Sequence, residues 1–288
     1  LNMRQYERWI LLGLLALIWG SSFILIKKGL VSYGFIEAAT LRMVAAGSVF
    51  AISAVFHLPK IPRQSWIYVV MASIFGMFLP AYLFCIAQQH VQSVVAGLLN
   101  ALTPAFAFVF SIFMFHSRYR WVQVSGLILG LMSAIILAFE RANGSVSFNA
   151  YALLIVLATV SYGFNINLVK KKLQNVPAMS LSYVSVFFAG LLATVFFLIP
   201  RWGDFHFDEG HKASLTALVV LGVMGTAVAQ VIYYRLIKIS TPLFTSSVTF
   251  LIPVVALIWG ILDGEVLHLV HLLCIGGILA SVAIIRKS

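Results

Sequence analysis

This chain is an array of predominantly hydrophobic stretches of about twenty residues, and charged residues fall almost entirely between these stretches. A helix rises ~1.5 Å per residue, so about twenty apolar residues cross the ~30 Å hydrocarbon core of a bilayer. The predicted spans are Trp9–Ile26, Phe35–Phe56, Ser65–Ala87, Val94–Phe115, Val122–Phe139, Tyr151–Val169, Leu181–Ile199, Leu215–Tyr234, Phe244–Leu262 and Leu267–Ile285. The pattern therefore predicts an all-α membrane protein with ten transmembrane helices.

The composition agrees with this prediction and argues against a soluble protein. The chain is 62% hydrophobic and 9% charged, whereas a soluble domain has about 25% charged residues. A soluble helical bundle would need a polar face on most segments, and a membrane barrel would need alternating strands of about ten residues. No cleavage signature follows the first apolar stretch, so we expect this span to be retained.

The basic residues are distributed unequally between the two sides of the predicted membrane domain. Of the 19 lysines and arginines, thirteen fall in loops on the side of the termini, five fall on the other side, and Arg42 lies inside a span. The positive-inside rule therefore places both termini in the cytoplasm and the protein in the cell's inner (plasma) membrane. The basic residues lie at span ends rather than on a soluble face, which argues against a nucleic-acid partner.

The two halves of the chain, residues 1–143 and 144–288, carry related patterns at nearly constant offsets. The matching pairs are Trp19 with Tyr162, Lys27 with Lys170, Gly76 with Gly225, Pro104 with Pro253, and Gly126 with Gly276. Each half has five spans, an odd number, so the second half must enter the membrane from the opposite side. The sequence thus predicts two inverted five-helix repeats, an arrangement that is common in secondary transporters.

The order of several short motifs resembles one transporter family. The motifs are the stretches Trp19–Phe23, Glu37–Ala46, Val95–Pro104 and Pro253–Glu265. Together they are similar to the EamA-type transporters of the drug/metabolite transporter superfamily. The resemblance implies ten helices, cytoplasmic termini, and export of amino acids or related metabolites. The chain departs from the family in one place, because Phe115-His116 stands where an acidic residue usually follows the fourth span, as Glu265 follows the ninth.

Polar residues inside the predicted spans are candidates for substrate binding, because each costs free energy in lipid unless it faces water or a partner. The candidates are Trp19, Tyr82, Asn100, Tyr162, Asn165, Gln230, Tyr233 and Thr249. Gln230 and Tyr233 share one helical face. The alternative role for each residue is an interhelical hydrogen bond, which contributes ~0.6 kcal/mol on average.

Two prolines and two charges complete the set of candidate functional residues. Pro104 and Pro253 lie at matching positions inside the fourth and ninth spans. Proline removes a helical hydrogen bond, so the pair is predicted to form hinges or bends and to free carbonyls for substrate near Asn100 and Thr249. Arg42 lies about five residues after Glu37. It either pairs with Glu37 or snorkels in a structural role, or it acts as a gate or contacts a substrate carboxylate.

The aromatic and amide character of these candidates favours a neutral amino acid as substrate, aromatic ones included. Export by alternating access is expected to be facilitative, because no span carries a central Asp, Glu or His that could relay protons. A lipophilic cation or drug is the alternative substrate, and a membrane receptor or scaffold is the alternative of another class. The expected partners are the small-molecule substrate and the lipid bilayer, and the protein is expected to be a monomer.

An enzyme is not expected. The segment Gly20–Phe23 superficially fits a serine-nucleophile pattern, but no span offers a central histidine as its base. No zinc-binding His-Glu-x-x-His helix and no phosphate-binding Gly-x-x-x-x-Gly-Lys loop occur, so neither a metal nor another cofactor is predicted. Cys85 and Cys274 lie within spans and are interpreted as small packing residues.

Overall fold

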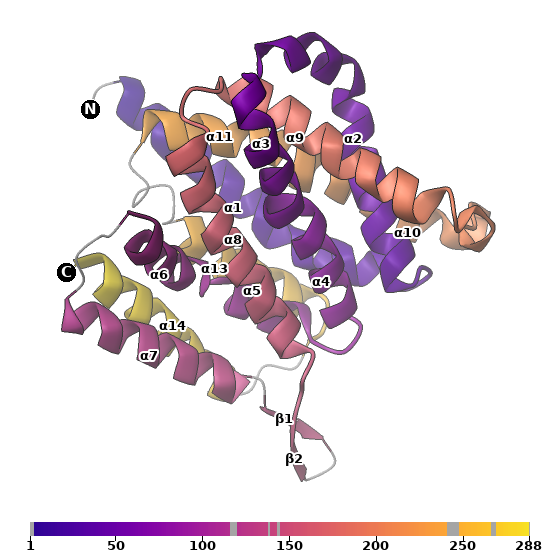
Figure 1. The fold of residues 1–288 in the computed structure, drawn as a ribbon. Helices are drawn as coiled ribbons and strands as arrows, with labels where there is room; N and C mark the ends of the chain where they lie inside the picture. Colours follow the sequence, from indigo (N-terminus) through magenta and orange to yellow (C-terminus); the bar gives the residue numbers. More distant parts are fainter. Residues whose placement is uncertain are drawn as a thin grey trace.

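The computed structural model describes residues 3–115, 120–137, 139–142, 145–240, 248–265 and 269–287, which form a bundle of helices (Figure 1). The first half contains α1 (Met3–Gly29), α2 (Phe35–His57), α3 (Trp66–Ser73), η3 (Ile74–Phe78), α4 (Leu79–Ala87), α5 (Ser93–Asn100), α6 (Thr103–Phe115) and α7 (Trp121–Leu137). The second half contains α8 (Ala152–Lys172), α9 (Ala178–Ala193), η4 (Thr194–Leu198), α10 (Lys212–Val220), η7 (Leu221–Val228), α11 (Ala229–Ile239), α13 (Val248–Leu262) and α14 (Leu269–Lys287).

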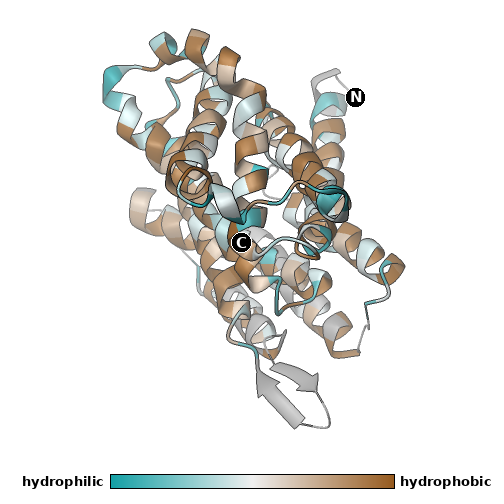
Figure 2. Cartoon of the chain, turned by 90° about the vertical axis from the view of Figure 1, so that its right-hand side faces the viewer, coloured by the Kyte–Doolittle hydropathy of each residue, from teal (hydrophilic) through white to brown (hydrophobic). Residues whose placement is uncertain are grey.

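These elements correspond to the ten predicted spans. In the described residues, seven continuous helical stretches are long and apolar enough to cross a membrane, and three shorter apolar helices lie in the fifth, ninth and tenth spans. Hydrophobic residues extend along the helices, and the hydrophilic ones concentrate near their ends and in loops (Figure 2). Large apolar side chains such as Ile52, Phe113 and Leu269 are exposed on the outer surface, as expected of helices that face lipid.

The structure adds details that the sequence did not predict. A short antiparallel hairpin of β1 (Phe139–Ala142) and β2 (Ser145–Phe148) joins the two halves, so Phe139 begins a strand instead of ending the fifth span. Three spans contain π-helical turns, in η3, η4 and η7. The predicted first residues of the ninth and tenth spans, Phe244 and Leu267, and the departure at His116 lie outside the described residues.

Helix packing follows the predicted two-fold relation between the halves. α1 packs against α13, and its counterpart α8 packs against α6, the counterpart of α13. The two remaining large contacts, α2 with α9 and α7 with α14, each join a helix to its own counterpart (Figure 1). A Cβ added to Gly47 of α2 would lie 2.8 Å from the Cα of Gly190 in α9, its partner in the repeat. Two equivalent helices therefore cross in backbone contact near the pseudo-two-fold axis.

The same relation appears in the contacts of a second pair of glycines. A Cβ on Gly20 of α1 would collide with Val255 of α13, and a Cβ on Gly163 of α8 would collide with Phe106 of α6. Gly163 and Phe106 are the repeat counterparts of Gly20 and Val255. Small residues at these crossings let the helix backbones approach closely, which is how helices associate in lipid.

Contacts at the helix ends show that the two halves have opposite orientations. Lys27, near the end of α1, bonds to Glu265, which in turn accepts a hydrogen bond from Ser93 at the start of α5. Lys171, near the end of α8, donates a hydrogen bond to the carbonyl of Met114, near the end of α6. Because α5 and α6 together form the fourth span, α1 and α8 end on opposite sides of the membrane. The predicted fold of two inverted repeats is confirmed.

The two repeat-related prolines occupy different positions in their helices. Ala101 and Leu102 form a turn between α5 and α6, so Pro104 lies in the first turn of α6, where proline is well tolerated. Pro253 lies inside α13. Pro104 therefore follows a break in the fourth span, whereas Pro253 interrupts the hydrogen-bond ladder of a continuous helix.

Candidate functional site

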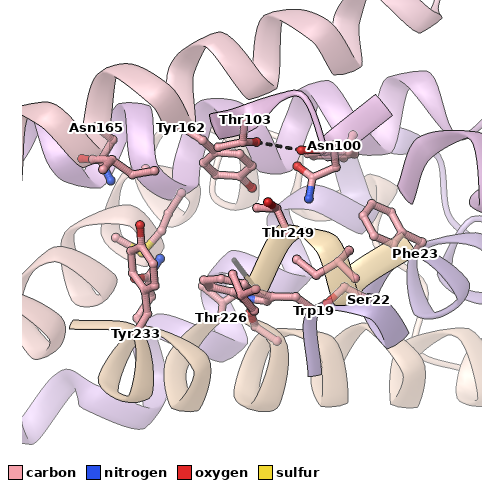
Figure 3. Close-up of a pocket in the computed structure, with 18 of the residues that line it drawn as sticks. Trp19, Ser22, Phe23, Asn100, Thr103, Tyr162, Asn165, Thr226, Tyr233 and Thr249 are labelled. Carbon is pink, nitrogen blue, oxygen red and sulfur yellow. Dashed lines mark hydrogen bonds between the residues drawn. The ribbon is translucent and has the colours of Figure 1, made fainter. Parts of the chain in front are cut away.

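A cavity lies between the two halves, in the middle of the bundle, and has a volume of about 120 Å³. Residues from α1, α2, α4, α5, α6, α8, α11 and α13 and from two of the three π-helical segments, η3 and η7, line it. A cavity of this size is far larger than one water molecule needs, so it has room for a small-molecule ligand. Residues from both halves face one another across it (Figure 3).

The cavity brings together most of the residues that the sequence singled out. The predicted residues that line it are Trp19, Arg42, Asn100, Pro104, Tyr162, Asn165, Gln230, Tyr233 and Thr249. These residues lie on six different spans, and the two-fold relation between the halves places them around one midpoint. Their role in transport stays a prediction, but their convergence on one cavity is a property of the fold.

The cavity wall does not include Tyr82, Pro253 or Glu37. The Tyr82 hydroxyl is hydrogen-bonded to Thr40 Oγ1 at 2.9 Å, and its ring packs 4.8 Å from the ring of Phe197. Tyr82 thus packs between helices and satisfies its polar atom there, as buried tyrosines commonly do. It has the structural contacts of an interhelical residue.

The expected pairing of Glu37 with Arg42 is not among the ion pairs of the described residues. Arg42 instead donates from a terminal guanidinium nitrogen to Thr226 Oγ1 at 3.2 Å, and Glu37 lies against Gly34 at the start of α2. Residues five apart on a helix point in different directions, whereas residues three or four apart are neighbours. The spacing therefore turns Arg42 towards the cavity and Glu37 away from it.

The carboxamides of the cavity are buried and incompletely hydrogen-bonded. Asn100, Asn165 and Gln230 are between 4% and 9% exposed, and their side-chain oxygens have no partner among the described residues. A buried polar group without a partner costs about 1–3 kcal/mol. Such a cluster in a cavity is expected where a ligand or water completes the hydrogen bonds. A carboxamide can also present its NH₂ group there by rotating through a half-turn.

Trp19 is held in the cavity wall by a π-helical carbonyl. Its indole Nε1 donates to the backbone oxygen of Gly225 at 3.1 Å, and its ring meets Tyr233 edge-on at 5.2 Å. Gly225 lies in η7, where the wider π-helical turn alters the normal ladder of backbone bonds. A Cβ on Gly225 would lie 3.0 Å from the hydroxyl oxygen of Ser22.

The first half has an equivalent contact. A Cβ on Gly76 of η3 would lie 2.3 Å from the side-chain nitrogen of Asn165 on α8. Gly76 and Asn165 are the repeat counterparts of Gly225 and Ser22. Each half thus presents a glycine of a π-helical segment to a polar residue of the other half. The sequence marked both glycines as repeat partners but gave no signal that they lie in the cavity wall.

The carbonyl that the sequence predicted to be free near Pro104 is partly occupied. The hydroxyl of Thr103 donates to the backbone oxygen of Asn100 at 2.8 Å (Figure 3). A carbonyl oxygen has two lone pairs, so this bond leaves it one acceptor site, and its contact with substrate stays a prediction. The side-chain oxygen of Asn100, which has no partner among the described residues, is also available to a ligand at this break.

A second polar cluster, here called the latch, joins the ends of three helices and comprises Lys27, Lys28, Asp263, Glu265 and the first amides of α5. Lys27 Nζ lies 2.8 Å from Asp263 Oδ2 and 2.9 Å from Glu265 Oε1, and Lys28 Nζ lies 2.9 Å from Asp263 Oδ1. The backbone nitrogens of Ser93 and Val94 each donate to Glu265 at 3.1 Å. Hydrogen bonds from the two lysines lower the pKa of the Asp263 carboxyl below its usual value of 3.8. The latch therefore links the two repeats at one end of the bundle.

The comparison with known proteins identifies the family. The sequence model of the EamA-like transporter family matches residues 7–139 and again residues 149–287, so it covers nearly all of the chain in two copies. This chain belongs to the EamA-like transporter family. It is a multi-pass membrane transporter of the drug/metabolite type, as its motifs predicted.

Individual relatives are distant and carry different names. The inner membrane transporter YedA of Escherichia coli (strain K12) is 26% identical over 277 residues, which cover 94% of this chain and 88% of that protein. An S-adenosylmethionine/S-adenosylhomocysteine transporter of Chlamydia muridarum is 24% identical, covering 88% of this chain and 84% of its own. A probable amino-acid metabolite efflux pump of Salmonella typhimurium is 24% identical over 253 residues, which cover 85% of this chain and 82% of that protein.

A solved crystal structure shares the fold of this chain. It aligns with a TM-score of 0.64 at 16% sequence identity and covers 96% of this chain and 94% of its own. At this level of identity the likeness shows the common architecture alone. The whole chain, rather than one half, therefore corresponds to the complete fold of that protein.

Proposed function

We propose that this transporter exports neutral amino acids, aromatic ones included, across the inner membrane by alternating access. The observation that carries the proposal is the cavity between the inverted repeats, with its buried carboxamides and its aromatic walls of Trp19, Tyr162 and Tyr233. Carboxamides and hydroxyls can hold the backbone groups of an amino acid, and aromatic rings can pack its side chain. Inverted repeats supply the exchange of inward-open and outward-open states.

The size and charge of the cavity favour an amino acid over the alternatives. A cavity of about 120 Å³ with a cationic side chain and several carboxamides in its wall suits a small zwitterion. A lipophilic cation would meet no carboxylate in the described wall of the cavity. The name of the Salmonella relative, an amino-acid metabolite efflux pump, points to the same substrate class. The inner membrane location is supported by the name of the Escherichia coli relative.

Counterflow in proteoliposomes with a panel of labelled neutral amino acids tests the proposal. We expect accelerated exchange for at least one of them, inhibition by its unlabelled form, and no exchange of quaternary cations. Exchange of quaternary cations without any amino acid would overturn the substrate class. Absence of flux for every solute in well-folded protein would favour a receptor or scaffold.

Substitutions in the cavity test its role. Gln230→Leu is expected to weaken binding of the amino-acid backbone by about 1 kcal/mol, or about fivefold, because a hydrogen bond is lost, and Asn100→Leu should do the same. Tyr233→Ala should instead shift selectivity between large and small side chains. Gln88→Leu is the matched control, because Gln88 is also a buried glutamine but is not among the residues that line the cavity and donates to the backbone oxygen of Phe23. Equal effects of Gln230→Leu and Gln88→Leu on apparent affinity would contradict the assignment.

The orientation in the membrane is part of the proposal. We place both termini in the cytoplasm, so the segment from Arg201 to Lys212 lies outside. A cysteine introduced there should react with an impermeant thiol reagent in intact cells, whereas one between Lys170 and Pro177 should not. The two native cysteines, Cys85 and Cys274, are buried and give little background. Equal labelling of both loops would refute this orientation.

A further inference from the structure

Arg42 is the one charged side chain among the described residues that line the cavity. It is 9% exposed and lies in α2, well inside the spanning segment. One terminal nitrogen of its guanidinium bonds to Thr226, and its Nε has no hydrogen-bond partner among the described residues. A guanidinium has five N–H donors, so Arg42 has donors at the cavity that remain available to a ligand.

The backbone contacts of Arg42 fix where its side chain emerges. A Cβ on Gly222 of η7 would lie 2.4 Å from the backbone oxygen of Arg42. The two helices therefore touch at this residue, and α2 cannot rotate there without a collision. An arginine near the end of a span could extend to the membrane surface, but one held against η7 at this depth keeps its charge next to the cavity.

An uncompensated positive charge inside a membrane protein is expensive. An arginine inside a span usually faces a partner or a water-filled cavity for this reason. Among the described residues no carboxylate forms an ion pair with Arg42, because the ion pairs of this part of the chain all involve other residues. The cavity thus provides a positive, planar, donor-rich group with no fixed anion, and this is the chemistry that recognises a carboxylate.

We infer that Arg42 binds the carboxylate of the transported molecule and makes a carboxylate a requirement for transport. The ammonium group of an amino acid would then be held by dipoles and ring faces, since Trp19, Tyr162 and Tyr233 line the same cavity. This inference rests on the proposed function and deepens it. It assigns the selection against amides, amines and quaternary cations to one residue.

The test compares an amino acid with its carboxamide, in which the carboxylate is replaced by an uncharged group, in the wild type and two variants. The ligands are the neutral amino acid that gives the fastest counterflow in the wild type and its carboxamide, used as competing inhibitors. We expect the wild type to bind the acid at least about tenfold more tightly than the amide. Arg42→Gln should weaken the acid by about 10- to 100-fold, as expected for a charge-assisted hydrogen bond, and leave the amide nearly unchanged. Arg42→Lys, which keeps the charge, should recover part of the preference.

A structural role for Arg42 gives a different result. If Arg42→Gln weakens the acid and the amide by the same factor, or if the wild type does not distinguish them, the inference is overturned while amino-acid transport stands. If no neutral amino acid competes in the wild type, the proposed function itself fails. Should Arg42→Gln not fold, the acid-to-amide ratio of the wild type and its change in Arg42→Lys still decide the question.

Discussion

Neutralising Glu265 is expected to open the end of the protein that the latch holds together. The Glu265 side chain is 3% exposed and accepts hydrogen bonds from Lys27 and from the two first amides of α5. Glu265→Gln keeps the size of the side chain but replaces one acceptor with an NH₂ group and removes the charge. Two amides at the start of a helix then lose a carboxylate, which is the group that a helix N-terminus favours.

The free-energy cost of Glu265→Gln follows from the number and burial of these contacts. Charged hydrogen bonds contribute ~1.5–3 kcal/mol each, and breaking a fully buried ion pair costs ~3–5 kcal/mol. The side chain of Lys27 is 38% exposed and keeps its contact with Asp263, so part of that cost is screened by solvent. We therefore expect a loss of about 2 kcal/mol, which changes the ratio of closed to open states at this end by about 30-fold.

The assay is the rate at which a cysteine in the cavity wall, Ser22→Cys, reacts with an impermeant reagent added from the latch side. We expect the rate to rise by about the same factor in Glu265→Gln. Glu209→Gln is the matched control, because Glu209 is 88% exposed and pairs with Lys212 on the surface, where such pairs contribute little. Indistinguishable labelling rates in Glu265→Gln and Glu209→Gln would show that the latch does not keep this end closed.

Three further outcomes are expected. Gly190→Ala should lower the melting temperature in detergent by an amount equivalent to about 1–3 kcal/mol, because its Cβ would lie 2.7 Å from the Cα of Gly47. Gly13→Ala is the control and should be neutral or stabilising, because nothing lies within 4 Å of its Cβ. Equal changes of melting temperature in the two variants would contradict the close crossing of α2 and α9. Pro253→Ala and Pro104→Ala should each slow flux more than they weaken binding, with the larger effect at Pro253 inside its helix; wild-type flux in both would refute the hinges. Asp263 has a lowered pKa, so its stabilisation is complete above its usual pKa and is lost only as pH falls below it; the difference in melting temperature between wild type and Asp263→Asn should be constant from about pH 5 to pH 8.

The span pattern and the repeat could be predicted from the sequence because lipid imposes a simple rule on every span. Polar residues were also informative, since an amide such as Gln230 or Asn165 stands out in an apolar helix. The apolar part of the cavity wall, including Met43 and Met77, could not be found in this way. A methionine that faces a cavity has the same hydropathy as one that faces lipid or another helix.

Tyr82 is a polar residue that the sequence assigned to the cavity wall but that lies outside it. By the offset that relates Gly76 to Gly225, its counterpart in the eighth span is Val231, and its hydroxyl pairs with Thr40 of α2. The counterparts of Thr226 and Tyr233 by the same offset are Met77 and Phe84, and both of these line the cavity. Tyr82 was singled out because it is polar, but a shift of one or two residues along a helix turns a side chain by ~100–200° to another face.

The latch makes the two ends of the transport path chemically different, although the helices that form them are related by the repeat. At one end Lys27 meets Asp263 and Glu265. At the other end the sequence repeats the lysine as Lys170, but the counterpart of Glu265 is His116, and no Asp or Glu occurs between residues 110 and 120. The ion pair that the described residues form at that end, Arg235 with Glu7, has a largely exposed arginine, and such pairs contribute little. Under the alternating access proposed above, the buried latch would therefore shift the resting population towards states closed at its own end, by about 2 kcal/mol. In the proposed orientation the latch lies on the outer side, so a substrate from the cytoplasm would find the cavity accessible before the latch opens, as the proposed export requires.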